Sequence, residues 1–271
     1  MKPTPVTISG STALVTGAGS GIGRATALAL ASAGAHVLVA DLDLTSAEKT
    51  AADCGGHAFA VDVSDPEQVG ALGAEVTAGH GTPDIVVNNA GVGMSGRFLD
   101  MDLDDWTWII GINLMGAVHT SKAFGPAMVE RGSGHVVNVA SGLAYTPRAT
   151  EPGYVATKAA ILAFTQCLRA DWHGRGVGVS AICPGVINTN IVRSNTRYKG
   201  ERADARTISS VQKAFKRGHP PEKVAAAIID AVRRNRSVVP VGFEATFGWV
   251  SRSLIPTRLV DLGARTQIRG L

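Results

Sequence analysis

Tyr154 and Lys158 have the residue types and the spacing that could move a proton in catalysis. Four residues apart on a predicted helix, they lie on one face, where their side chains are neighbours. A lysine ammonium beside a phenol favours the phenolate, so the pair predicts a tyrosine pKa lowered towards working pH. Ser141, at the end of a predicted strand, can hydrogen-bond a substrate oxygen and polarise a carbonyl or steady an alkoxide. These three residues predict acid–base chemistry at an alcohol or a carbonyl group.

A glycine-rich turn follows the first predicted strand and leads directly into a predicted helix. Within it Gly17 permits the tight turn, Gly21 lets the backbone approach a pyrophosphate, and Gly23 lets the helix pack on the strand. The amino terminus of the helix adds free N–H groups and the positive end of the helix dipole. The turn therefore predicts a dinucleotide cofactor, and its sequence is Thr16-Gly17-Ala18-Gly19-Ser20-Gly21-Ile22-Gly23.

The carboxylate of Asp41 points to one of the two nicotinamide dinucleotides. Asp41 ends the second predicted strand, eighteen residues after Gly23. An acidic side chain at this place can accept hydrogen bonds from both ribose hydroxyls of the adenosine, and it repels a 2′-phosphate. Neither Ser20 nor Leu42 supplies a compensating cation, so the sequence predicts NAD as the cofactor.

Short β-branched segments alternate with longer amphipathic segments along the chain. Continuous apolar strands indicate burial on both faces, and the alternation indicates βαβ units. We therefore expect a single α/β domain, a Rossmann-like, doubly wound, seven-stranded parallel sheet with helices on both faces. Strands are predicted over residues 12–16, 36–40, 57–61, 84–87, 135–139, 177–182 and 237–241. Helices are predicted over residues 21–33, 45–53, 65–79, 103–130, 152–173 and 221–234.

In their order and spacing along residues 12–241, these motifs resemble those of the short-chain dehydrogenase/reductase family. The further matching positions are Asp62-Val63 after the third predicted strand, Asn88-Asn89-Ala90-Gly91 after the fourth, Asn113 within a helix, and Pro184-Gly185-Val186-Ile187-Asn188-Thr189 after the sixth. The resemblance implies an NAD(P)-dependent enzyme that acts on CH–OH groups by hydride transfer.

The resemblance also implies a role for each matching position. It makes Asn113 the residue that holds a proton-relaying water near Lys158, and it places the stretch beginning at Pro184 against the nicotinamide carboxamide. The catalytic residues that follow are Ser141, Tyr154, Lys158 and Asn113. The cofactor-binding residues that follow are Gly17, Ser20, Gly21, Ile22, Asp41, Asp62, Val63, Asn89, Ala90, Gly91, Tyr154, Lys158, Pro184, Gly185, Ile187 and Thr189. Many family members pair through the two long helices, so the resemblance implies a homotetramer or a homodimer.

Two segments depart from the strand–helix rhythm. Residues 190–218 are polar, basic and weakly periodic, and a segment of that length without a strand is typical of a substrate lid. Residues 243–271 form an aromatic tail after the catalytic domain of residues 1–242, and we expect the tail to pack on its own or a neighbouring subunit. Membrane contact through this tail is an alternative that the pattern does not favour.

Composition and charge exclude several classes of protein. Hydrophobic residues make up 45% and charged residues 18%, which excludes a disordered chain. Three cysteines without metal-ligand spacing, and no targeting segment, favour the cytoplasm. The seven histidines show no paired spacing, so no metal is predicted. Residues 193–271 carry 16 Lys and Arg against 6 Asp and Glu, which is either a solvated basic surface or an attraction for anionic ligands. No basic segment carries interleaved aromatics, so nucleic acid is not expected.

The substrate prediction rests on three loops, residues 92–98, 142–152 and 190–218. The first two are largely apolar, which favours a lipophilic secondary alcohol or ketone of sterol, retinoid or acyl type. The third is basic and suggests the alternative of a 3-oxoacyl thioester reductase, whose carrier protein or coenzyme A would be anionic. A non-catalytic NAD-binding sensor is the second alternative, and the retained Ser141, Tyr154 and Lys158 argue against it.

Overall fold

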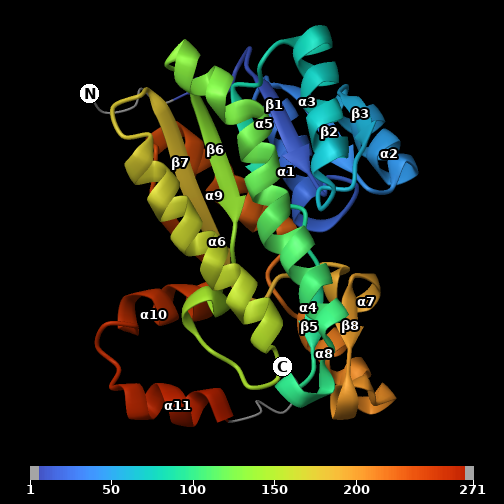
Figure 1. The fold of residues 1–271 in the computed structure, drawn as a ribbon, viewed down its shortest axis with the longest axis vertical. Helices are drawn as coiled ribbons and strands as arrows, with labels where there is room; N and C mark the ends of the chain where they lie inside the picture. The colour runs from blue at the N-terminus through green and yellow to red at the C-terminus, as the bar shows by residue number, and fades with distance from the viewer. Residues whose placement is uncertain (1–5, 266–271) are drawn as a thin grey trace.

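An all-parallel sheet of seven strands lies at the centre of the computed structural model, which describes residues 6–265. The strand order is β3-β2-β1-β4-β6-β7-β9, with a crossover on each side of β1 (Figure 1). The predicted doubly wound, seven-stranded fold is therefore confirmed. The strands are β1 Thr12–Thr16, β2 His36–Asp41, β3 His57–Ala60, β4 Ile85–Asn88, β6 Gly134–Val139, β7 Val177–Pro184 and β9 Val238–Val241.

Helices cover both faces of the sheet because successive strand residues point to opposite faces and both are apolar. On β1, Ala13 and Val15 belong to one core cluster and Leu14 belongs to the other. The first cluster includes side chains of α1 (Gly21–Ser32), α2 (Leu44–Cys54) and α9 (Pro221–Arg234). The second includes side chains of α3 (Pro66–His80) and α5 (Gly116–Arg131), with α6 (Pro152–Asp171) packed against it.

The helix predicted over residues 103–130 is present, but its regular α-helical period is interrupted. It consists of α4 (Leu103–Ile110), a π-helical turn (Gly111–Met115) and α5. In the π turn the amide of Asn113 bonds the backbone of Val92 instead of facing solvent. Such turns insert an extra residue into a helix and leave no mark in the apolar period, so the pattern did not reveal it.

The basic segment 190–218 contains a strand, contrary to the prediction. Its elements are α7 (Ile191–Ser194), β8 (Thr196–Tyr198), a 3₁₀ turn (Gly200–Ala203) and α8 (Ala205–Lys216). β8 pairs in parallel with β5 (Gly93–Ser95) in a second, two-stranded sheet. Figure 1 shows this sheet with α7 and α8 beyond the main sheet, beside α4. A three-residue strand is too short to show an alternation of apolar and polar residues, so the sequence pattern did not predict these strands.

The C-terminal tail forms α10 (Phe243–Ser251) and α11 (Thr257–Arg265), separated at Pro256. α10 packs on the turn after β6, where the Tyr145 hydroxyl donates to the Ala245 carbonyl at 2.7 Å and the Tyr145 ring meets Trp249 edge-on. The remaining predicted tail residues, 266–271, lie outside the described residues. Contact of the tail with a second subunit stays a prediction. None of the helices in residues 6–265 is long and apolar enough to span a bilayer.

A buried imidazole joins two central strands. His135 on β6 is 1% exposed, and its Nε2 lies 2.8 Å from the Ser180 hydroxyl on β7. Burial, together with a smaller effect of the Arg169 charge, lowers the pKa of His135 to about 3. The folded chain therefore keeps this imidazole neutral over most of the acid range.

We expect His135 to make the fold sensitive to acid. As pH falls below about 6.5, the unfolded chain binds a proton at this imidazole that the folded chain does not. Stability is thus present above pH 6.5 and is lost towards pH 3, with a limiting slope of about 1.4 kcal/mol per pH unit. Denaturant unfolding at pH 7, 6 and 5 measures the slope in wild type and in His135→Gln, where it should be smaller. His173→Gln, at an exposed position, is the control. Equal slopes in wild type and His135→Gln would contradict the assignment.

Candidate active site

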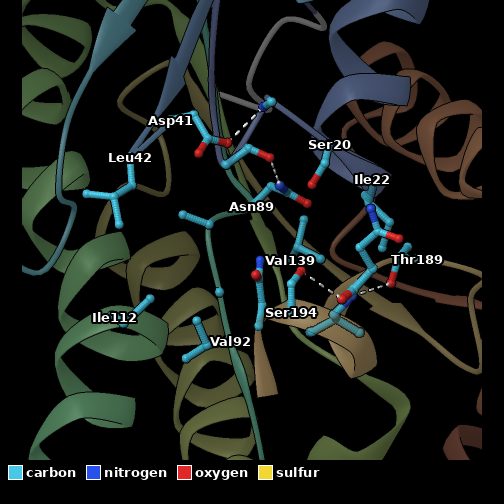
Figure 2. A pocket seen from close by; sticks show the side chains of 18 of the residues that line it. Ser20, Ile22, Asp41, Leu42, Asn89, Val92, Ile112, Val139, Thr189 and Ser194 are labelled. Atoms are coloured by element: carbon cyan, nitrogen blue, oxygen red, sulfur yellow. Dashed lines mark hydrogen bonds between the residues drawn. The ribbon is translucent and has the colours of Figure 1, made fainter. Parts of the chain in front are cut away.

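A cleft of about 660 Å³ opens at the carboxyl ends of the central strands. Its walls come from the turns after β1, β4 and β7 together with the ends of β2 and β6. Figure 2 shows Asp41 and Leu42 on one side of the cleft and Ile22 and Thr189 across from them. Parallel strands bring all their carboxyl ends to one edge, so residues distant in sequence share this cleft.

The glycine turn after β1 leaves room that a side chain would fill. Gly17 has φ +62°, and a Cβ there would lie 2.8 Å from the Cα of Ala90. A Cβ on Gly23 would lie 2.1 Å from the Gly17 carbonyl oxygen, so α1 packs directly on the turn. The Ser20 side chain does not cap α1, which leaves first-turn N–H groups available for an anion. The geometry fits a dinucleotide whose pyrophosphate rests on this helix end.

Asp41 holds the glycine turn while its carboxylate faces the cleft. Its Oδ2 accepts from the Gly19 amide at 2.8 Å, and its Oδ1 accepts from the Asp43 amide at 3.1 Å. The carboxylate thus has a fixed orientation before any ligand binds, and each oxygen keeps a free lone pair. Ribose hydroxyls are donors of the kind these lone pairs accept.

Two adjacent asparagines connect the strands beneath the cleft. Asn88 donates to the Asn138 side chain at 2.8 Å inside the sheet. Asn89 donates from Nδ2 to the Thr16 carbonyl at 2.9 Å, and its backbone N–H donates to the Thr16 hydroxyl at 3.1 Å. These bonds tie the turn after β4 to the turn after β1, so the two cofactor-facing turns are held as one unit.

Ser141, Tyr154 and Lys158 meet at the inner end of the cleft, which all three line. The Lys158 ammonium nitrogen lies 5.9 Å from the centroid of the Tyr154 ring and donates to the Val139 carbonyl at 2.9 Å. Lys158 is 5% exposed, and burial lowers its pKa to about 8. The three predicted side chains are therefore neighbours: Ser141 comes from the turn after β6, and Tyr154 and Lys158 come from α6.

The expected low pKa of Tyr154 is wrong for the chain by itself. Burial raises the pKa of Tyr154 to about 12, a hydrogen bond with Ser141 acts in the opposite direction, and the charge of Glu151 raises it again. Desolvation disfavours the phenolate more than the surrounding side chains favour it. Without a ligand the tyrosine is thus a protonated phenol at neutral pH, ready to donate.

Asn113 lies one layer behind the cleft and does not line it. Its Oδ1 accepts from the Val92 amide at 2.8 Å, and its Nδ2 donates to the Val92 carbonyl at 3.0 Å and to Thr157 at 3.2 Å. A Cβ on Gly91 would lie 3.2 Å from Asn113 Oδ1 and 3.4 Å from Lys158 Nζ, so the asparagine is close to the lysine. These contacts fix the turn after β4, and the water-relay role stays a prediction.

All sixteen predicted cofactor residues line the cleft, and Asn113 alone of the predicted catalytic residues does not. The positions of these residues therefore fit a nicotinamide dinucleotide in the cleft, and the role of each residue stays a prediction. Other residues that line the cleft were not among the predicted cofactor residues; they include Leu42, Asp43, Ser46, Val61, Trp108, Ile112, Val139 and Ala140. Val92, Asn190, Ile191, Ser194, Asn195 and Phe215, which also line it, belong to loops that the sequence assigned to the substrate.

Glu244 is a supporting residue that the sequence did not single out. It lies in the first turn of α10, and its Oε1 accepts from the Val186 amide at 2.7 Å, inside the Pro-Gly stretch after β7. A Cβ on Gly185 would lie 2.0 Å from the same oxygen. The tail thus secures the turn that faces the cleft, and no local motif could signal a contact between residues 58 positions apart.

A second cavity of about 310 Å³ adjoins the first and shares Ser141 and Tyr154 with it. Most of its wall is apolar, and its polar end carries Arg148 and Glu151, 4.0 Å apart. Burial raises the pKa of Glu151. The apolar lining residues are Met94, Leu143, Pro184, Val186, Ile191, Val192, Val211, Phe215 and Ala245. The catalytic tyrosine candidate therefore stands between a cofactor-sized cleft and a smaller, apolar cavity.

Comparison with known proteins places the chain among related sequences and structures. It is 46% identical over 242 residues to the "probable oxidoreductase EphD" of Mycobacterium tuberculosis (strain ATCC 25618 / H37Rv), covering 85% of this chain and 41% of that relative's length. It is 37% identical over 226 residues to the D-threitol dehydrogenase of Mycolicibacterium smegmatis (strain ATCC 700084 / mc(2)155), covering 82% of this chain and 85% of that one.

The solved structures agree with the fold. A short chain dehydrogenase/reductase from Burkholderia phymatum in complex with NAD superposes with a TM-score of 0.83 at 28% identity, covering 98% of this chain and 99% of that one. The sequence profile described as short chain dehydrogenase matches residues 11–200. The cleft, the glycine turn and these matches lead to one conclusion, that the chain belongs to the short-chain dehydrogenase/reductase family.

Proposed function

We propose that the chain is an NAD-dependent oxidoreductase that interconverts a secondary alcohol and a ketone on an apolar substrate. The observation that carries this proposal is the position of Tyr154 and Ser141 on the wall shared by the two cavities. A group in the smaller cavity can place its oxygen at these hydroxyls while its carbon faces the cleft. The family membership and the relatives named as oxidoreductase and D-threitol dehydrogenase support the reaction class.

The chain's own residues would bind, orient and exchange the proton. The first turn of α1 would hold the pyrophosphate, and the Asp41 carboxylate would accept from the adenosine ribose hydroxyls. A nicotinamide cofactor bound in the cleft supplies the hydride acceptor or donor and, when oxidised, a positive charge. Ser141 would hydrogen-bond the substrate oxygen, which keeps that oxygen within reach of Tyr154.

Tyr154 is the group that would hold or release the proton. Its raised pKa keeps the phenol protonated, so in carbonyl reduction the hydroxyl donates its proton to the developing alkoxide. In alcohol oxidation the phenolate must accept that proton, and positive charge beside the ring favours it. Lys158, whose pKa lies near 8, is the charge that the chain itself can bring there.

We expect Tyr154→Phe to lower kcat by about 10²–10⁴-fold, because the proton donor is gone while the ring remains. Steady-state assays with secondary alcohols and NAD measure the loss, and fluorescence titration with NADH should give an unchanged Kd. Tyr145→Phe is the matched control, since it removes a half-buried hydroxyl that donates to Ala245 and lines neither cavity. Unchanged turnover in Tyr154→Phe would overturn the acid–base role. NADH binding without turnover in wild type would favour the sensor alternative.

The choice of NAD over NADP rests on Asp41. A carboxylate oriented by two backbone amides is a fixed negative charge at the place where a 2′-phosphate would sit. The adjacent Leu42 is 72% exposed and brings no cation. This surface supports NAD, and a solved relative in complex with NAD is consistent with it.

We expect Asp41→Asn to shift the ratio of kcat/KM for NADP to that for NAD upward by roughly tenfold to a hundredfold. The amide oxygen can still accept from Gly19, so the variant removes the like-charge repulsion, which costs a few kcal/mol, and keeps the turn. Asp53→Asn, in an exposed ion pair with Arg24, is the control. A wild-type enzyme that already prefers NADP would contradict this reading of the carboxylate.

The apolar wall of the smaller cavity supports a lipophilic substrate over a thioester. Three of the eight cations in the basic segment are engaged within the chain: Arg197 and Lys199 pair with Asp105 at 3.1 and 2.7 Å, and Arg202 donates to Ser95 at 3.0 Å. These cations therefore hold the segment on α4 and β5 and are not free to bind phosphates. The exposed cations that remain in the segment for the thioester alternative include Arg193 and Arg206.

We expect Val211→Ala to raise KM for apolar alcohols by about 3- to 10-fold with little change in kcat, because it removes buried methyl groups that contact the substrate before and during reaction. Val211 is 7% exposed and lines only the smaller cavity. Val250→Ala, 63% exposed on α10, is the control. Faster turnover of acetoacetyl coenzyme A with NADPH, weakened by Arg206→Ala, would instead support the thioester reductase.

A further inference from the structure

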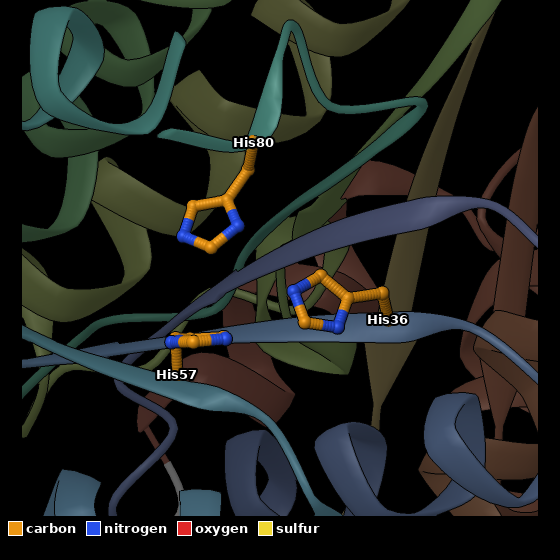
Figure 3. Close-up of side chains that lie close together, drawn as sticks. All are labelled: His36, His57 and His80. Atoms are coloured by element: carbon orange, nitrogen blue, oxygen red, sulfur yellow. The ribbon is translucent and has the colours of Figure 1, made fainter. Parts of the chain in front are cut away.

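Three histidines gather at the end of the sheet opposite the cleft. His36 begins β2, His57 begins β3, and His80 ends α3. Their ring centroids lie 5.1 Å (His36–His57), 5.3 Å (His36–His80) and 4.6 Å (His57–His80) apart. Figure 3 shows the three rings grouped around a common space, each reached from a different element. Successive members lie 21 and 23 positions apart, so the cluster has no local spacing that the sequence could reveal.

The pleat of the sheet explains why the rings meet. Leu38 pairs with His57, so His57 shares a face with Leu38 and with His36, two residues earlier on β2. That face is covered by α3, on which His80 lies one turn after the buried Val76. The three imidazoles thus lie at the solvent-exposed end of the apolar layer between α3 and the edge strands.

The imidazoles offer nitrogen ligands that are close enough for one ion. One ring nitrogen from each lies within 4.8 Å of the other two. Tetrahedral zinc with Zn–N bonds of about 2.0–2.1 Å needs ligand nitrogens roughly 3.3 Å apart. Rotation of surface histidines about their side-chain torsions covers that difference. Among residues 6–265, no hydrogen bond or ion pair engages a ring nitrogen of these three histidines.

Each imidazole binds a metal through a neutral ring nitrogen, so metal binding releases any proton that this nitrogen carries. His57 is exposed, so solvent can reach the ion and supply a fourth ligand.

We propose that His36, His57 and His80 form a binding site for a divalent transition-metal ion, with Zn²⁺ held by three imidazoles and a water. A nitrogen-only donor set excludes the hard cations Ca²⁺ and Mg²⁺, which take oxygen ligands. The ion would join β2, β3 and α3 at their solvent-facing ends. Its place at the amino ends of the strands, away from Tyr154, makes it a stabilising site and leaves the redox reaction to the cleft.

The test is Zn²⁺ binding to the full chain, freed of any affinity tag and treated with chelator. Calorimetric titration should give one site with a Kd on the order of 1 µM. Saturating Zn²⁺ should raise the midpoint of thermal unfolding by roughly 3–8 °C. Co²⁺ in place of Zn²⁺ should produce the visible absorption of a tetrahedral ion. Chelation should leave turnover in the cleft unchanged, so this result is independent of the proposed reaction.

The variants His36→Ala, His57→Ala and His80→Ala should each weaken Zn²⁺ binding by at least the roughly tenfold loss that follows removal of a group supporting a ligand. His173→Ala, exposed and outside the cluster, should bind as wild type does. Because His57 is exposed, its truncation should leave the fold intact, and circular dichroism checks this. Equal Zn²⁺ affinity in wild type and His57→Ala, or no saturable binding to wild type, would overturn the proposal.

Discussion

Parallel pairing of all seven strands is the constraint from which the site follows. Each strand is reached by a crossover that passes over a face of the sheet, so every carboxyl end arrives at one edge. Gly17, Asp41, Asn89, Ser141 and Pro184 end or follow five different strands and meet in one cleft for this reason. The helices bury both faces of the strands, which fixes the relative positions of these residues without any direct bond among most of them.

Burial, which holds the fold together, also sets the chemistry of the cleft. It moves the pKa of Lys158 down to about 8 and the pKa of Tyr154 up to about 12, towards the neutral form of each. Burial therefore keeps Tyr154 a protonated phenol, and positive charge beside the ring would favour the phenolate. The same desolvation keeps His135 neutral in the sheet. One physical effect thus shifts the pKa of two groups in the cleft and of a third inside the sheet.

The smaller cavity is built from long-range contacts that the parallel sheet does not dictate. Arg197 and Lys199 anchor the segment after β7 on the acidic start of α4 through Asp105. Glu244 brings the tail back to the Val186 amide. These contacts place an apolar cavity beside Tyr154. They also pair lysines and arginines that the composition alone would suggest are available to an anionic ligand. A segment rich in lysine and arginine does not form a basic binding surface where its side chains pair with carboxylates of the same chain.

The sequence by itself determined the seven-stranded fold, because continuous apolar strands and short connections have few other ways to bury both faces. Its local motifs also indicated sixteen cofactor residues and Ser141, all of which line the cleft, but not the other lining residues. Only the tertiary structure decided the π turn at Asn113, the β5–β8 pair, the raised pKa of Tyr154 and the cluster of His36, His57 and His80. Each of these depends on partners distant in sequence or on desolvation by the assembled core. Neither cause produces a periodic pattern of residues along the chain.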